Sequence, residues 1–121
     1  MYELTMESQF DSAHNLRRYS GPCEALHGHT YRVQVFYTGD SLDDLGILID
    51  FRRLKTALGE VISYLDHRYL NELLEFQQQN PTAENIARVI YEKMQDLIPG
   101  GVTKTTVWET PTSSASYWSE E

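Results

Sequence analysis

The chain has 121 residues, of which 40% are hydrophobic and 23% charged, so we expect a single globular domain over residues 1–121. Eighteen acidic residues against ten basic ones give a formal charge of −8, which argues against a nucleic-acid partner because such a partner requires a basic face. The single cysteine, Cys23, excludes an internal disulfide, and the N-terminal residues do not resemble a signal peptide, so we expect a cytoplasmic protein without a membrane partner.

Two strands are predicted in the first third of the chain. Polar and apolar side chains alternate over residues 2–10 with the period of two that is typical of a half-buried strand. A Ser-Gly-Pro turn then closes an irregular segment. A second strand is predicted over residues 27–38, with His27 and His29 on the same face as two valines and polar side chains on the other face. The sheet is therefore expected to have one face in contact with water.

The periodicity becomes helical in the middle of the chain. Over residues 50–65, apolar side chains recur at the spacing of a helix that is buried on one face. A second helix is predicted to begin after Thr82, which can cap it, and to end before a Pro-Gly-Gly sequence, with Leu97 as the last residue of its apolar face. Residues 102–109 and 113–119 contain β-branched and aromatic side chains and are predicted to be strands.

The predicted elements follow the order strand, strand, helix, helix, strand, strand. Two hairpins on either side of a helical pair predict an α+β fold, in which a four-stranded antiparallel sheet carries both helices on one face. Such a sheet has two open edges, which favour aggregation unless something covers them. Association of subunits would cover them, so we expect a homo-oligomer.

Three of the four histidines lie close together in the sequence, at His14, His27 and His29. The rings of His27 and His29 share one strand face, and His14 can reach the same place if the two strands pair. Buried neighbouring imidazoles are unfavourable without a shared partner, and a metal ion satisfies all of them. Three neutral imidazoles suit Zn²⁺ and leave a fourth position free, as in catalytic sites. A cupin also uses a His-x-His pair, but with a glutamate shortly after it, and no acid lies between His29 and Asp40.

Three further places carry candidate chemistry. Cys23 could be the fourth ligand of a closed structural zinc site, a free thiol that the metal makes a usable base, or an ordinary buried cysteine. Asp66 could orient His67 as a proton shuttle, or the pair could simply end a helix. Glu109 shares a predicted strand face with Thr103. If that face is the inner one, the carboxylate needs either a guanidine-like ligand edge or a salt bridge.

Taken together, the run Cys23-x-x-x-His27-Gly28-His29 with His14, Asp66-His67 and Glu109 resembles the 6-pyruvoyltetrahydropterin synthase family, including its bacterial 6-carboxytetrahydropterin synthase branch. The resemblance covers nearly the whole chain, because further segments follow in the family's order at residues 10–14, 49–51, 65–71, 80–84 and 109–110. It implies the T-fold, in which the sheets of several subunits join into a β-barrel, commonly as trimers stacked into hexamers. The active sites would then lie between subunits.

The resemblance also implies a role for each candidate residue. His14, His27 and His29 would hold zinc, Cys23 would be the proton-abstracting base, and Asp66 with His67 would form a second proton-transfer unit. Glu109 would anchor the amino-pyrimidine edge of the pterin. The implied substrate is 7,8-dihydroneopterin triphosphate.

Two branches of that family use this substrate differently. The carboxy branch releases acetaldehyde and triphosphate and leaves 6-carboxy-5,6,7,8-tetrahydropterin, an early intermediate of queuosine biosynthesis. The pyruvoyl branch retains the side chain as a diketone on the route to tetrahydrobiopterin. The compact length and the early position of His14 resemble the carboxy branch, so we expect a zinc-dependent 6-carboxytetrahydropterin synthase, a lyase.

Two alternatives stay open. One is the pyruvoyl-forming synthase, and the other is a non-catalytic zinc- or pterin-binding module, which the presence of Cys23, Asp66 and His67 disfavours. An acidic protein that binds a triphosphate needs a local group of cations. Candidate contacts for it are Arg17, Arg18 and Lys104.

Overall fold

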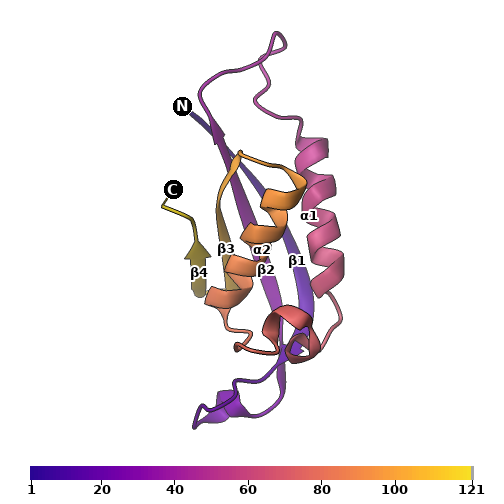
Figure 1. The fold of residues 1–121 in the computed structure, drawn as a ribbon, viewed down its shortest axis with the longest axis vertical. Coiled ribbons are helices and arrows are strands. Elements are labelled where there is room, and N and C mark those ends of the chain that lie inside the picture. Colours follow the sequence, from indigo (N-terminus) through magenta and orange to yellow (C-terminus); the bar gives the residue numbers. More distant parts are fainter. Residues whose placement is uncertain (121) are drawn as a thin grey trace.

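The structure is a computed structural model that describes residues 1–120, and Figure 1 shows its architecture. Four antiparallel strands form one sheet in the order β1-β2-β3-β4, and the helices α1 and α2 cover one of its faces. These elements are β1 (Tyr2–His14), β2 (His27–Gly39), α1 (Phe51–Leu65), α2 (Ala83–Leu97), β3 (Val102–Thr110) and β4 (Ser113–Tyr117). The predicted α+β fold and the order of its elements are therefore confirmed.

The hairpin of β1 and β2 positions the N-terminal histidines. The two strands pair over their whole length, from Tyr2 opposite Gly39 to His14 opposite His27. β1 continues beyond the predicted end at residue 10, and its inner face becomes more buried towards His14. This extension places His14 and His27 side by side at one end of the sheet.

Each long helix begins at a residue whose side chain caps it. Asp50 Oδ1 accepts a hydrogen bond from the backbone N–H two residues on at 2.8 Å, and Thr82 Oγ1 accepts one from the N–H three residues on at 3.1 Å. The predicted apolar faces pack against the core, except that Leu97 is 39% exposed. The prediction for Leu97 is wrong because the helix ends there, and Ile98, which follows with a non-helical backbone, is buried instead. Within residues 1–120, no helix is long and apolar enough to cross a membrane.

A bulge near the start of β3 changes which side chains share a face. Thr103 is an extra residue between two successive pairs of β2 and β3, and it is exposed. The prediction that Thr103 lies on the same face as Glu109 is therefore wrong, because an extra residue reverses the alternation. At the C-terminal end, β4 stops at Tyr117, two residues before the predicted end at 119.

The segment between the helices lines the outer edge of β1. It contains two short 3-10 helices, η2 (Leu70–Glu72) and η3 (Leu74–Phe76), which the sequence pattern did not predict. The backbone N–H of His67 donates to the carbonyl oxygen of Asp11 at 2.7 Å. This segment therefore covers the edge of β1 at the end that carries His14.

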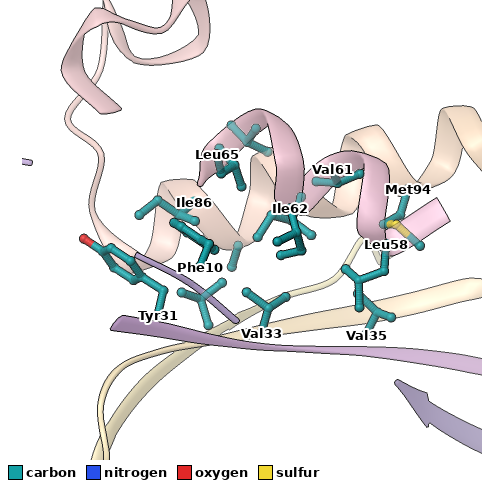
Figure 2. Close-up of a cluster of buried hydrophobic side chains, with 14 of the residues drawn as sticks. Phe10, Tyr31, Val33, Val35, Leu58, Val61, Ile62, Leu65, Ile86 and Met94 are labelled. Carbon is teal, nitrogen blue, oxygen red and sulfur yellow. The ribbon is translucent and has the colours of Figure 1, made fainter. Parts of the chain in front are cut away.

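The core lies between the sheet and the helices, as Figure 2 shows. Inward-facing side chains of β1 and β2 contact the buried faces of both helices, and Phe10 stacks on Tyr31 with ring centroids 4.8 Å apart. Tyr31 is fully buried, and its hydroxyl group has no hydrogen-bond partner among the described residues. Burial raises the pKa of Tyr31, so the hydroxyl stays protonated. An unpaired buried hydroxyl of this kind lowers stability.

The substitution Tyr31→Phe should therefore raise the free energy of unfolding, by about 1 kcal/mol. Urea denaturation of the metal-free protein measures the change. Tyr64→Phe is the matched control, because the Tyr64 hydroxyl donates to Glu75 Oε1 at 2.7 Å, and its removal should lower the free energy of unfolding by about 1 kcal/mol. Changes of the same sign in both variants would contradict this account.

Candidate active site

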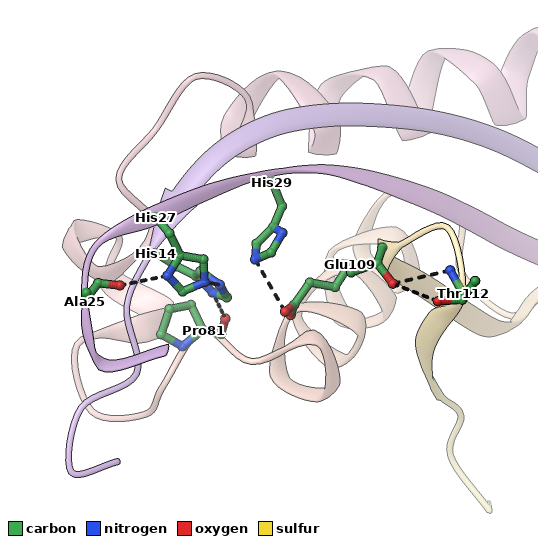
Figure 3. Close-up of polar contacts among 8 residues, drawn as sticks. His14, Ala25, His27, His29, Pro81, Glu109 and Thr112 are labelled. Carbon is green, nitrogen blue, oxygen red and sulfur yellow. Dashed lines mark hydrogen bonds and ion pairs between the residues drawn. The ribbon is translucent and has the colours of Figure 1, made fainter. Parts of the chain in front are cut away.

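The three histidines of the first two strands meet at one end of the sheet, on the face that carries the helices. His14 is the last residue of β1, His27 is the first residue of β2 opposite it, and His29 follows on the same face. One ring nitrogen of each lies within 4.8 Å of the others. Figure 3 shows the rings of His14 and His27 together and the ring of His29 pointing towards Glu109. The predicted convergence of the three histidines is therefore confirmed.

The hydrogen bonds of His14 and His27 hold Nε2 of each ring close to Nε2 of the other. Nδ1 of His14 donates to the carbonyl oxygen of Pro81 at 2.7 Å, and Nδ1 of His27 donates to that of Ala25 at 2.7 Å. Because a carbonyl oxygen can only accept, Nδ1 is the donor in each ring. The two Nε2 atoms are 3.0 Å apart, and in neutral rings that donate from Nδ1 each of them carries a lone pair. A cation between them would remove this conflict.

His29 adds a third unpaired nitrogen. Its Nε2 is buried and has no hydrogen-bond partner within residues 1–120, although Glu109 Oε1 lies 3.4 Å away. Burial lowers the pKa of both His14 and His29 below the ordinary value of 6.5, against the opposing effect of the Glu109 charge. Both rings are therefore neutral at neutral pH, which is the form that binds a metal. The group could hold a metal ion, and three imidazole nitrogens are a donor set that suits zinc.

Cys23 lies in the loop between β1 and β2, outside this group. It is half-buried in the 3-10 helix η1 (Pro22–Glu24), and its carbonyl oxygen accepts a hydrogen bond from the N–H of Leu16 at 2.8 Å. Over residues 1–120, the cluster of metal-ligand atoms at this place consists of histidines and does not include the sulfur atom. The geometry thus favours the free thiol over the fourth ligand of a closed site.

Asp66 and His67 lie on the outer edge of β1, apart from the three histidines. Nδ1 of His67 is 3.0 Å from Asp66 Oδ2, and the same carboxylate accepts the N–H of Asp11 at 2.9 Å. These hydrogen bonds, from Asp11 first and His67 second, lower the pKa of Asp66. The His67 side chain is 80% exposed, so it is available to a molecule that approaches this edge.

Glu109 lines an open pocket of about 530 Å³ together with His29. The pocket forms where β3 ceases to pair with β2, beyond the pair of Arg32 and Trp108. The guanidinium of Arg32 lies over the Trp108 ring, 4.6 Å from its centroid, and lines the same pocket. Sequence reasoning missed Arg32, because strand alternation places it on the face opposite His29.

The basic residues that the sequence analysis named as candidate triphosphate contacts lie outside this pocket. The guanidinium of Arg17 donates to the carbonyl oxygens of Gln79 and Asn71 at 3.2 and 3.1 Å, and Nζ of Lys104 lies 4.3 Å over the Phe36 ring. Neither side chain lines the pocket beside Glu109 within the described residues, and neither does Arg18.

Comparison with known proteins identifies the family. The family model for 6-pyruvoyl tetrahydropterin synthase matches residues 3–120. The chain belongs to this family. The fold of the family is also shared: the structure of 6-pyruvoyl tetrahydropterin synthase from Caenorhabditis elegans superposes with a TM-score of 0.86, at 30% identity, over 99% of this chain and 98% of that one.

The relatives that this chain matches have different names. The 6-carboxy-5,6,7,8-tetrahydropterin synthase of Synechocystis is 36% identical over 98% of this chain and 95% of its own length. The dihydroneopterin monophosphate aldolase of Pyrococcus furiosus is also 36% identical, over 88% of each chain. Identity to relatives therefore points to pterin chemistry more firmly than to one reaction.

Proposed function

We propose that this protein is a zinc-dependent 6-carboxy-5,6,7,8-tetrahydropterin synthase, which converts 7,8-dihydroneopterin triphosphate and one water molecule into 6-carboxytetrahydropterin, acetaldehyde and triphosphate. The observation that carries the proposal is the convergence of three histidine ring nitrogens, with Nε2 of His14 and Nε2 of His27 3.0 Å apart, beside a pocket lined by Glu109. The Synechocystis relative, which this chain matches over nearly its whole length, supports the choice of reaction.

The three histidines are the proposed zinc ligands. His14, His27 and His29 supply three nitrogens and leave one coordination position for the substrate. Zinc bound there would act as a Lewis acid on the hydroxyl groups of the substrate side chain. Glu109 would accept hydrogen bonds from the amino-pyrimidine edge of the pterin, for which its carboxylate has two acceptor oxygens.

Cys23, Asp66 and His67 are the proposed proton-transfer groups. The thiolate of Cys23 would take the proton from a side-chain carbon next to a hydroxyl group. Asp66 holds the Nδ1 side of His67, so Nε2 is the atom that would exchange a proton with the substrate. Since the pKa of Asp66 is lowered, its carboxylate stays ionised and can stabilise the imidazolium that forms.

We further propose that each site is shared between subunits of a cytoplasmic homo-oligomer. Asp66 and His67 lie on the β1 edge, outside the histidine group of their own chain, and would serve the site of a neighbouring copy. β1 and β4 are the two edges of the sheet, so pairing of the part of β1 that the segment after α1 does not cover with β4 of the next copy would close a barrel. Trimers stacked as a hexamer, measurable by analytical ultracentrifugation, are the expected assembly.

Arg32 is the proposed contact for the triphosphate, because it is the only Lys or Arg that lines the pocket in residues 1–120. Arg32→Gln should raise the KM for the triphosphate substrate about tenfold, the loss expected for a charged hydrogen bond, and leave kcat nearly unchanged. Steady-state kinetics measure both. Lys104→Gln is the control, since this cation lies over Phe36 outside the pocket. An equal KM change in both variants would argue against a role for Arg32.

Zinc affinity should fall at acidic pH. Protons compete with the metal for His14 and His29, and the pKa of each ring is lowered from 6.5. Affinity should therefore fall as the pH decreases into the acidic range and be nearly constant between pH 8 and 9. Competition with a chromophoric chelator across this range measures it. A clear rise in affinity from pH 8 to 9 would indicate a thiolate ligand instead.

Product analysis distinguishes the candidate functions. Incubation of the zinc-loaded protein with 7,8-dihydroneopterin triphosphate should yield acetaldehyde, triphosphate and 6-carboxytetrahydropterin by mass spectrometry. A diketone pterin without acetaldehyde would support the pyruvoyl-forming alternative. No turnover would support the non-catalytic zinc- or pterin-binding module. Cleavage of dihydroneopterin monophosphate but not of the triphosphate would support the aldolase function named for the Pyrococcus relative.

A further inference from the structure

Two asparagine side chains hold the backbone of the segment that follows His14. Each accepts a hydrogen bond from a backbone N–H and donates one to the carbonyl oxygen of the same residue. Asn80 accepts a hydrogen bond at Oδ1 from the N–H of Arg17 at 2.8 Å and donates one from Nδ2 to the Arg17 carbonyl oxygen at 2.9 Å. Asn71 makes the same reciprocal pair with Asn15, at 3.1 and 3.0 Å. Each pair fixes both the position and the orientation of the backbone it contacts, because two bonds of opposite direction must form together.

Asn80 is also held from the other side. Its carbonyl oxygen accepts a hydrogen bond from Nδ2 of Asn85 on α2 at 2.8 Å. The guanidinium of Arg17 donates to the carbonyl oxygen of Gln79, so a further bond joins the two segments. Asn80 therefore cannot shift without breaking contacts to both the segment after His14 and the first turn of α2.

These contacts complete a closed ring of covalent and hydrogen bonds that includes His14. The ring runs along the chain from His14 to Arg17, across the side chain of Asn80 to Pro81, and back through the Pro81 carbonyl oxygen to Nδ1 of His14. The Pro81 carbonyl fixes the tautomer of His14 and directs its Nε2 towards His27. The place of that carbonyl is in turn fixed by the residue before it.

We propose that Asn80 is a positioning residue for the metal centre: its side chain sets the distance between the Pro81 carbonyl and His14 and so holds Nε2 of His14 in the orientation that binds the ion. The proposal rests on the proposed metal role of the three histidines. Without the Asn80 side chain, the bond from the Arg17 guanidinium to the Gln79 carbonyl would remain, but the segments that carry His14 and Pro81 would be held together more loosely and the bond that fixes the tautomer would lengthen. Asn80 touches neither the metal nor the substrate in this scheme.

Zinc affinity and the Co²⁺ spectrum of folded protein test the proposal. The dissociation constant for zinc is measured by chelator competition at pH 7.5 for the wild type and Asn80→Ala, and the visible absorption of Co²⁺ reports the ligand geometry. Asn80→Ala should weaken zinc binding on the order of tenfold and change the Co²⁺ bands, as loss of an outer contact does in metal sites. Gln95→Ala is the matched control. It removes a side-chain hydrogen bond to the Val102 carbonyl at the far end of α2 and should change neither readout.

The outcomes separate this proposal from the proposed function. A wild-type protein that binds no zinc would overturn the metal role itself. A wild type that binds zinc, with equal affinity and equal Co²⁺ bands in folded Asn80→Ala, would overturn the positioning role alone. If Asn80→Ala does not fold, Asn85→Ala takes its place, because it removes only the bond to the Asn80 carbonyl. It should weaken zinc binding in the same direction, and unchanged affinity there would overturn the proposal.

Discussion

Cys23→Ala should lower kcat by a factor of about 10²–10⁴, the usual contribution of a general base, while zinc stays bound as in the wild type. The reason is the position of the residue. The sulfur atom lies outside the group of histidine nitrogens, so its removal takes away a proton acceptor and leaves the proposed ligands intact. Steady-state turnover and the metal content are measured on the same preparation.

Cys23→Ser is the control for this prediction, because it keeps a hydrogen-bonding side chain of similar size but offers a far weaker base. It should be nearly as slow as Cys23→Ala and should bind the same amount of zinc. Loss of zinc in Cys23→Ala would show that the thiol is a ligand and that the site is structural. Unchanged turnover in both variants would remove Cys23 from the proposed mechanism.

His29→Ala should abolish both zinc binding at micromolar concentration and turnover. The expected loss of zinc affinity exceeds the ten- to hundredfold effect of an outer contact, because a direct ligand disappears. Removal of this ring also leaves His14 and His27 as the remaining histidines of the site. Metal analysis after gel filtration, followed by the product assay, measures the two losses.

His67→Ala is the matched control for His29→Ala, because it removes the one histidine that lies outside the group, on the edge of β1. It should retain zinc at the wild-type level and lose most of its turnover. If His67→Ala released zinc, or if His29→Ala retained it, the assignment of ligands and proton-transfer groups would be wrong.

Much of the fold could be predicted because its elements carry strong local signals. The alternation over residues 2–10, the helical spacing over residues 50–65 and the Thr82 cap are each properties of neighbouring residues. The failures come from features that depend on the whole sheet. Thr103 is displaced by a bulge that only the pairing of β3 with β2 reveals. Leu97 is exposed because α2 ends at this residue and Ile98, which follows with a non-helical backbone, is buried in its place.

Some residues of the candidate site could likewise be predicted from the sequence, and others could not. The convergence of His14 with His27 and His29 could be predicted, since it requires only that two neighbouring strands pair. Arg32 could not, because the pocket opens at the place where β3 leaves β2, which brings side chains of both sheet faces together.

The role of Asn80, like that of Arg32, could not be predicted from the sequence. Its partner Arg17 lies 63 residues away in the chain, so no local pattern indicates the contact. The proposed roles of Asn80 and Arg32 both follow from contacts between residues that are far apart in the chain, and local sequence patterns do not reveal such contacts.

Zinc K-edge X-ray absorption of the zinc-loaded protein tests the central claim most directly. The account predicts a first shell of nitrogen and oxygen scatterers at about 2.0–2.1 Å, from three imidazoles and one exchangeable molecule. A sulfur scatterer at about 2.3 Å would mean that Cys23 occupies the fourth position, and that the metal has no place for a substrate.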